Sequence, residues 1–329
     1  MADSRSVTVV GDGQMGLVLA EQLASAGHHV VLWGPFAESL AALATTRRSP
    51  RLPELRLSDR IAIEADPAKA AAGAEVLVSA IPVQFLRPVW TRFPAGRAPV
   101  VSVSKGIETS TLERPSEILA ELRPGTSTCV LSGPTIASEL ARRLPATMVA
   151  ASDDDHLART VQALFLASWM RVYTSPDPLG VEIAGAAKNV IAIAAGILDG
   201  LEAGFNAKSA LLARGLAEIV RLGRALGARS ETFSGIAGVG DLATTCFCPE
   251  GRNRTCGEAI GRGVSLDEHL GSIDSVVEGV ETSKAICRLA ADRDVEMPIA
   301  EAVRRVLFEG LPPRDALAGL MQREVGVEV

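Results

Sequence analysis

Lysine is scarce in this chain, and one lysine lies where an amine could do chemistry. The 329 residues include 5 Lys and 28 Arg, so each position that keeps a primary amine is informative. Lys188 interrupts the run Ile183-Ala-Gly-Ala-Ala-Lys188-Asn189-Val-Ile-Ala-Ile, which predicts a helix that is apolar on nearly every face and therefore buried. A buried ammonium is costly unless it faces a cleft or a partner. Lys188 is therefore a candidate general acid or base, although a lysine whose amine reaches the surface fits the same pattern.

A glycine-rich turn near the start of the chain predicts a site for a dinucleotide. Gly11-Asp12-Gly13-Gln14-Met15-Gly16 follows the apolar run Val7–Val10 and precedes the helical pattern Leu17–Ala26. In G-x-G-x-x-G turns of this kind, the first glycine allows the tight turn, the second lets a pyrophosphate approach the backbone, and the third allows close helix–strand packing. The strand before and the helix after favour dinucleotide binding over a purely structural turn.

The acid that usually follows such a turn by about twenty residues is missing. Trp33 leads into Gly34-Pro35-Phe36, and the first carboxylate after the predicted strand is Glu38. This leaves NADP open, and Arg47-Arg48 are near enough in sequence to be considered for its 2′-phosphate, although an exposed basic pair on a loop is the favoured interpretation. The preference between NAD and NADP is undecided.

Other polar residues carry weaker signals. Lys105 follows the predicted strand Val100–Val103, and ligands of open α/β sheets bind at such carboxyl ends, although a loop lysine is equally ordinary. Asp241 and Thr245 follow a glycine pair, and Arg252-Asn253 could bind phosphate, although a helix cap, a surface residue and a solvated turn would look the same. Cys246, Cys248 and Cys256 have no nearby His, so no metal site is predicted.

The pattern of elements predicts two domains. Short apolar runs alternate with helical patterns in the first half, which is typical of a doubly wound, Rossmann-like and mainly parallel sheet. The character changes near Asp177-Pro178, where a capped helix can begin, and the later patterns are helical. We predict an NAD(P)-binding α/β domain at 1–177 and an all-helical substrate domain at 178–329. The predicted strands are Val7–Val10, Val30–Trp33, Arg60–Ile63, Val76–Ile81, Val100–Val103, Thr128–Leu131, Thr147–Ala150 and Arg171–Tyr173.

Composition limits the partners. The formal net charge is −6 and the pI is near 5.4, which argues against nucleic acid or an anionic membrane as partner. The longest apolar candidate, around Val190–Leu198, falls short of a membrane span, and the first residues do not resemble a signal peptide. An odd number of cysteines (5) fits a reducing compartment. We therefore expect a cytoplasmic protein with no membrane insertion.

Taken together, these motifs resemble the NAD(P)-dependent glycerol-3-phosphate dehydrogenases of the bacterial type. The resemblance runs nearly end to end, and its most specific parts are the Lys188 segment and Gly-Asp241-Leu followed by Arg252-Asn253. It also includes the glycine turn, Ser104-Lys105-Gly106, Ser132-Gly133-Pro134-Thr135, Ala213-Arg-Gly-Leu-Ala-Glu218 and Val277-Glu278-Gly279-Val280.

The resemblance implies an oxidoreductase that interconverts sn-glycerol 3-phosphate and dihydroxyacetone phosphate with NAD(P)(H) and supplies glycerol 3-phosphate for phospholipid synthesis. It implies catalytic roles for Lys188, Lys105 and Asp241, and a homodimer. The implied substrate-binding residues are Lys105, Gly133, Thr135, Lys188, Asn189, Asp241, Thr245, Arg252 and Asn253. The implied cofactor-binding residues are Gly11, Gly13, Gln14, Met15, Gly16, Lys105, Ala137, Arg252, Val276 and Glu278.

The chain departs from the family's pattern at Gln14-Met15 and at Pro35, where the family has other residues next to the cofactor. These departures bear on nucleotide preference and affinity. Two other functions stay open at this point. One is a β-hydroxyacid-type dehydrogenase acting on a related small substrate, and the other is a non-enzymatic nucleotide-sensing module.

Overall fold

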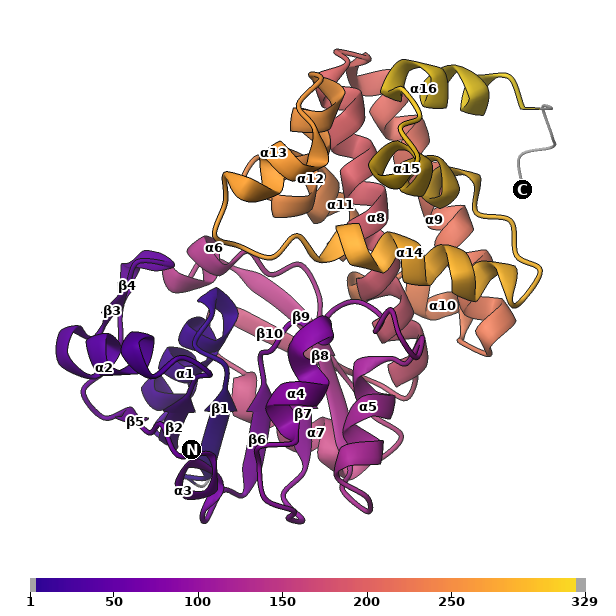
Figure 1. Cartoon of the computed structure of the whole chain (residues 1–329). Coiled ribbons are helices and arrows are strands. Elements are labelled where there is room, and N and C mark those ends of the chain that lie inside the picture. Colours follow the sequence, from indigo (N-terminus) through magenta and orange to yellow (C-terminus); the bar gives the residue numbers. More distant parts are fainter. Residues whose placement is uncertain (1–3, 324–329) are drawn as a thin grey trace. The chain divides into compact units, whose positions relative to one another are not determined.

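The computed structural model describes residues 4–323, and these form two compact units (Figure 1). The first unit contains the chain up to Lys105 together with Glu113–Glu182. The second contains Gly106–Leu112 and the chain from Ile183 onward. The division after Glu182 falls inside helix α8 (Pro178–Gly200). The domain limits predicted from the sequence, with the second domain starting at residue 178, stay a prediction.

The first unit is built on a twisted eight-stranded sheet with the order β10-β9-β8-β7-β6-β1-β2-β5. All neighbouring pairs are parallel except β8 and β9, which are antiparallel. The predicted Rossmann-like fold is therefore confirmed, and each predicted strand has a counterpart in this sheet. The strands are β1 (Ser6–Val10), β2 (His29–Trp33), β5 (Ala62–Ile63), β6 (Val76–Ser79), β7 (Val100–Ser102), β8 (Thr128–Ser132), β9 (Ala146–Ala151) and β10 (Met170–Ser175), and a separate hairpin pairs β3 (Arg48–Ser49) with β4 (Leu52–Arg56).

Alternate residues of the central strands enter two different hydrophobic cores, as the period of two in a strand requires. Val7 and Val9 of β1 pack into one core with side chains of α1 and α7. Val10 packs into the other core with side chains of α4 and α5. Both faces of the sheet are therefore covered, which explains why its strands are so apolar. The helices of this unit are α1 (Gln14–Ser25), α2 (Ala37–Thr46), α3 (Pro67–Ala71), η1 (Val83–Phe85), α4 (Leu86–Trp90), α5 (Pro115–Leu122), α6 (Ala137–Ala141) and α7 (Asp155–Phe165).

The second unit is helical, and no strand occurs in the described stretch 183–323, as the sequence predicts. Its centre is α8, which α12 approaches closely: a Cβ built at Gly257 would lie 2.0 Å from the backbone oxygen of Ile193. Close packing through glycine therefore places the middle of α12 beside α8. The helices that follow α8 are α9 (Gly204–Leu226), α10 (Ser230–Phe233), η2 (Ile236–Gly240), α11 (Asp241–Phe247), α12 (Arg252–Gly261), α13 (Leu266–Gly271), α14 (Glu278–Ala291), α15 (Pro298–Phe308) and α16 (Pro313–Met321).

Helix α8 is long and apolar enough to cross a membrane by composition alone. However, 94% of its most apolar window is buried inside the protein. Asp177 caps its first turn by accepting a hydrogen bond from the backbone N–H of Gly180 at 3.0 Å, as predicted. This is the pattern of a core helix.

Glu218 is a buried carboxylate that holds the start of α15. Its two oxygens accept hydrogen bonds from the backbone N–H groups of Ile299 at 2.7 Å and Ala300 at 3.2 Å. Burial raises the pKa of the Glu218 carboxyl to about 7, from an ordinary value of 4.5. The stabilising contribution of this group is therefore complete below about pH 4.5 and is lost as the pH rises through about 7.

We expect stability to fall more steeply with pH in the wild type than in Glu218→Gln. Between pH 4.5 and 8.5 the extra loss in the free energy of unfolding should be about 3 kcal/mol, because each pKa unit corresponds to about 1.4 kcal/mol. Denaturant unfolding at a series of pH values measures this difference. Exposed Glu231 provides the control, and Glu231→Gln should behave as the wild type. An unchanged pH dependence in Glu218→Gln would contradict the assignment.

Candidate active site

Lys188 forms the centre of a buried polar cluster in the second unit. The lysine is only 5% exposed, as the apolar helix around it predicts. Its Nζ donates hydrogen bonds to Asp241 Oδ1 at 2.7 Å and to the Thr245 hydroxyl at 2.5 Å. The amine therefore does not reach the surface, which answers the alternative left open by the sequence. Its charge is compensated by a carboxylate that is itself 1% exposed.

A tight backbone turn presents Asp241 to the lysine. A Cβ built at Gly238 would lie 2.1 Å from the backbone oxygen of Phe233, so only glycine allows this close approach. Asp241 then begins α11, and Thr245 follows one turn later on the same face. The Thr245 hydroxyl donates to the backbone oxygen of Asp241 at 2.7 Å and so is oriented to accept from Lys188. Helix geometry explains the spacing of these two residues.

A second polar cluster includes Asn189, the residue that follows Lys188 on α8, and the start of α14. Asn189 donates from Nδ2 to Glu278 Oε2 at 3.4 Å, and Asn253 Oδ1 accepts from the backbone N–H of Gly279 at 2.9 Å. Asn253 is thereby oriented with its oxygen toward the start of α14. Arg252, the first residue of α12, is exposed and donates from Nη1 to the backbone oxygen of Val276 at 2.8 Å.

The neighbouring cysteine is not a nucleophile. Cys246 is buried beside Lys188 and Asp241, and burial raises the pKa of its thiol to about 12. It is therefore a neutral core residue at neutral pH. Within residues 4–323, no group of three or more His, Cys, Asp or Glu side chains is arranged to hold a metal ion.

In the first unit, adjacent strand ends bring a lysine and a small loop together. Lys105 follows β7, and Gly133-Pro134-Thr135 follows β8, which is paired with β7. Lys105 Nζ donates to the backbone oxygen of Gly133 at 3.2 Å, and the Thr135 hydroxyl donates to the same oxygen at 3.1 Å. The position of Lys105 at a carboxyl edge of the sheet is the one expected for ligand binding. Ala137 begins the next helix, α6.

The glycine turn has the shape that its sequence predicts. Gly11 has a φ of +120°, and a Cβ built at Gly16 would lie 1.9 Å from the Gly11 oxygen. A Cβ built at Gly13 would meet no described atom within 4 Å. Gln14 begins α1, and Met15 packs against the hydrophobic core on that side of the sheet. The turn therefore leaves room above Gly13 at the positive end of a 12-residue helix.

Family models match both halves of the chain. The model for the N-terminus of NAD-dependent glycerol-3-phosphate dehydrogenase matches residues 6–158, and the model for the C-terminus matches residues 177–318. The chain belongs to this family. It is 45% identical over 327 residues to the protein named glycerol-3-phosphate dehydrogenase [NAD(P)+] 2 of Salinibacter ruber, covering 97% of this chain and 95% of that protein.

A second sequence relative and one solved structure point to the same family. A glycerol-3-phosphate dehydrogenase [NAD(P)+] of Thermobifida fusca is 44% identical over 329 residues, with 98% of each chain covered. The crystal structure of a glycerol-3-phosphate dehydrogenase from Coxiella burnetii superposes with a TM-score of 0.94 at 31% identity, covering 97% of this chain and 99% of that one. The family assigned from sequence motifs is therefore confirmed.

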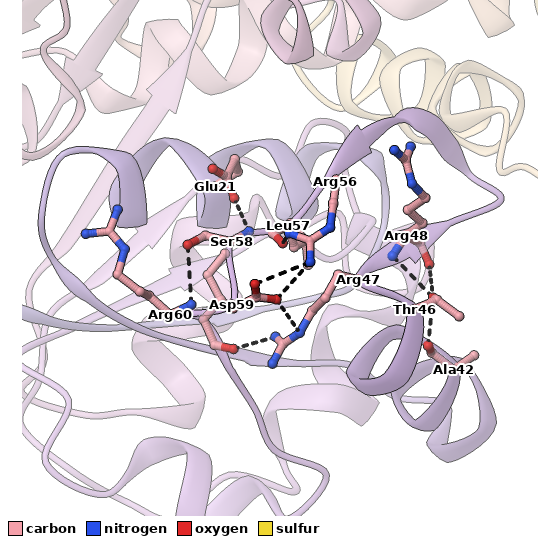
Figure 2. Close-up of polar contacts among 11 residues, drawn as sticks. Glu21, Ala42, Thr46, Arg47, Arg48, Arg56, Leu57, Ser58, Asp59 and Arg60 are labelled. Atoms are coloured by element: carbon pink, nitrogen blue, oxygen red, sulfur yellow. Dashed lines mark hydrogen bonds and ion pairs between the residues drawn. The ribbon is translucent and has the colours of Figure 1, made fainter.

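Both arginines of the pair considered for a 2′-phosphate have partners within the fold, and Figure 2 shows the contact of Arg47 with Asp59. The Arg47 guanidinium donates to the backbone oxygen of Ile61 at 2.7 Å and lies 3.7 Å from Asp59. Arg48 donates to the backbone oxygen of Pro53 at 2.9 Å. Arg48 is exposed, as expected, but it begins strand β3 and does not lie on a loop. Arg47 is largely covered, because it ties the end of α2 to the segment before β5.

The structure brings most of the predicted site residues together in three groups, each within one unit. The second unit holds two of them: the cluster of Lys188, Asp241 and Thr245, and the group of Asn189, Asn253 and Glu278 at the start of α14. The first unit holds the third group, which consists of Lys105, Gly133 and Thr135. Sequence reasoning missed Asp12, Ser39 and Arg51, which are linked to one another. The signal for Asp12 was a charged residue inside the glycine turn itself.

Proposed function

We propose that this chain catalyses the NAD(P)(H)-dependent interconversion of sn-glycerol 3-phosphate and dihydroxyacetone phosphate. The observation that carries the proposal is the buried Lys188 ammonium held by Asp241 and Thr245, in a chain that belongs to the glycerol-3-phosphate dehydrogenase family. In the reducing direction the reaction would supply glycerol 3-phosphate for phospholipid synthesis.

The glycine turn fits the pyrophosphate of a dinucleotide. Space above Gly13 and the backbone N–H groups at the start of α1 can receive two phosphates, and a side chain at Gly13 would fill that space. Bound there, the reduced nicotinamide supplies the hydride. Gly11, Gly16, Gln14 and Met15 shape the turn. Ala137, Val276, Glu278 and Arg252 are proposed as further cofactor contacts.

Lys188 supplies the proton for the reduction. Reduction of the carbonyl at C2 leaves negative charge on its oxygen, and an ammonium stabilises that charge and can deliver a proton to it. Asp241 fixes the position of Nζ and favours its charged form, and Thr245 orients the amine from a second direction. Lys105 is proposed to contribute a second ammonium beside the substrate and nicotinamide, with Gly133 and Thr135 as substrate contacts.

Arg252 and Asn253 are proposed to bind the substrate phosphate, with Asn189 as a further substrate contact. Since the Asn253 oxygen is used by Gly279, its NH₂ group is the end that can donate to an anion. A guanidinium suits phosphate because its N–H groups match two oxygens at once. In a chain of net charge −6 this positive site must be local.

Arg252→Ala is expected to raise the KM for dihydroxyacetone phosphate by about 30- to 100-fold, because a charge-assisted pair of hydrogen bonds is lost. The effect on kcat should be smaller, since Arg252 is proposed to bind the phosphate and not the reacting carbon. Steady-state kinetics measure both constants. Arg262→Ala, at the exposed end of the same helix, is the matched control. Equal losses with phosphorylated substrate and with unphosphorylated dihydroxyacetone would contradict a phosphate-binding role.

Oxidation of NADH or NADPH on addition of dihydroxyacetone phosphate tests the function directly. Activity on a non-phosphorylated β-hydroxyacid, with none on dihydroxyacetone phosphate, would favour a β-hydroxyacid-type dehydrogenase. Binding of a nucleotide without turnover of any such substrate would favour a sensing module.

A homodimer and a cytoplasmic location are part of the same proposal. Both follow the family resemblance, and the low pI and the odd number of cysteines support a soluble protein of a reducing compartment. Light scattering tests the assembly: a dimer has twice the 34.4 kDa mass of the chain.

A further inference from the structure

The end of β2 lacks an acid of its own, but a carboxylate from elsewhere occupies its place. Residue 34 is a glycine, and a Cβ built on it would lie 2.6 Å from Cγ and 2.7 Å from Oδ1 of Asp12. The Asp12 side chain therefore fills the space into which a side chain at position 34 would extend. In dinucleotide-binding sheets, the acid that accepts the adenosine ribose 2′-hydroxyl stands at this strand end.

The Asp12 carboxylate is fixed by its own set of partners. Asp12 is 3% exposed, and its Oδ2 accepts hydrogen bonds from the Ser39 hydroxyl at 2.6 Å and from Arg51 Nη1 at 3.0 Å. Gln14 donates to the backbone oxygen of Arg51 at 2.7 Å, which ties this arginine to the start of α1. Both bonds to the carboxylate fall on Oδ2, so Oδ1 is held on the side of Gly34.

An exposed aromatic ring lies near the arginine that pairs with this carboxylate. Phe36 follows the end of β2 by three residues and is 59% exposed. The Arg51 guanidinium lies 5.9 Å from the centroid of its ring. A flat apolar ring and a fixed carboxylate that share one arginine neighbour can together recognise a nucleoside, because the base can stack on the ring and the ribose can donate hydrogen bonds to the carboxylate.

We propose that Asp12 accepts the ribose 2′-hydroxyl of the adenosine and makes this chain selective for NAD(H) over NADP(H). The inference rests on the proposed binding of a dinucleotide at the glycine turn. A 2′-phosphate would place a second anion against a buried carboxylate, which is unfavourable. Arg51 pairs with Asp12 and moderates this repulsion. The Arg47 guanidinium is held by the backbone oxygen of Ile61 and by Asp59, the second of which Figure 2 shows, and the Arg48 guanidinium donates to the backbone oxygen of Pro53.

Dissociation constants for NADH and NADPH, measured by fluorescence titration on the full-length protein, test the proposal without relying on turnover. The wild type should bind NADH at least about tenfold more tightly than NADPH, the effect of one charged hydrogen bond. Asp12→Asn keeps the shape of the side chain and removes its charge, and should lower this ratio by about tenfold. Glu38→Gln removes an exposed charge from the neighbouring helix α2 and should leave the ratio unchanged.

A second variant keeps the test valid if Asp12→Asn fails to fold. Arg51→Gln leaves the Asp12 charge uncompensated, so it should weaken NADPH binding further while NADH binding changes little. Equal or tighter binding of NADPH by the wild type, or a ratio that neither variant shifts, would overturn the proposal. If either of these results is found and the protein still reduces dihydroxyacetone phosphate, the proposed role of Asp12 is contradicted and the proposed function is not. If neither nucleotide binds, the proposed function fails with it.

Discussion

Lys188→Ala is expected to lower kcat for the reduction of dihydroxyacetone phosphate by about 10⁴-fold, because proton donation and stabilisation of an oxyanion are each worth about 10²-fold. The dissociation constant of NADH should stay unchanged, since the nucleotide is proposed to bind at the glycine turn of the other unit. Stopped-flow or steady-state absorbance of NADH measures turnover, and fluorescence titration measures binding.

Three controls separate lost chemistry from lost structure. Lys188→Ala leaves the buried Asp241 without its cation, so thermal unfolding must show that the variant is folded. Lys188→Met keeps the length of the side chain and should be as inactive as the alanine variant. Lys284→Ala removes a half-buried amine that pairs with Glu281 on α14 and takes no part in the proposed site, and this variant should turn over normally. A folded Lys188→Ala enzyme with wild-type turnover would remove this amine from the mechanism.

The parts of the fold that depend on local patterns could be predicted from the sequence. Val7–Val10 was predicted as a strand because β-branched residues run directly into the glycine turn, and β1 is observed there. Helix α8 was predicted because its apolar residues leave no polar face. The antiparallel direction of β9 relative to β8 could not be predicted, because no local sequence pattern in either strand specifies the direction of its neighbour.

The candidate site was predictable in its residues but not in its contacts. The apolar surroundings of Lys188 indicated a functional amine, but its partner Asp241 lies 53 positions away in sequence, and only the packing of α8 with α11 joins them. Arg47 was considered for a phosphate because of its charge, whereas the fold gives it a backbone oxygen and Asp59. Arg51 was overlooked because its partner, Asp12, reaches it only once the hairpin of β3 and β4 has formed.

Asp241→Asn is expected to lower kcat/KM by about 10²-fold, while Thr245→Val should cost about tenfold or less. The asparagine keeps the shape of the side chain but removes the negative charge that pairs with the Lys188 ammonium, and breaking a buried ion pair costs about 3–5 kcal/mol. Valine at position 245 removes the single hydrogen bond that the hydroxyl accepts from Lys188 Nζ, which is worth about 1.5 kcal/mol, or about tenfold. Steady-state kinetics on both variants, with thermal unfolding in parallel, measure the difference.

The contrast between these two variants distinguishes positioning of the amine from general support of the cluster. If Asp241 acts by holding a charged Lys188, its loss should fall mainly on kcat, and Asp241→Glu, which restores a carboxylate, should recover part of the turnover. If the cluster were only structural, both variants should lower the unfolding temperature and leave kcat near the wild-type value, because the 2.7 Å contact would then stabilise the fold without serving the reaction. Equal kinetic losses in Asp241→Asn and Thr245→Val would likewise contradict the role of charge, since only one of them changes it.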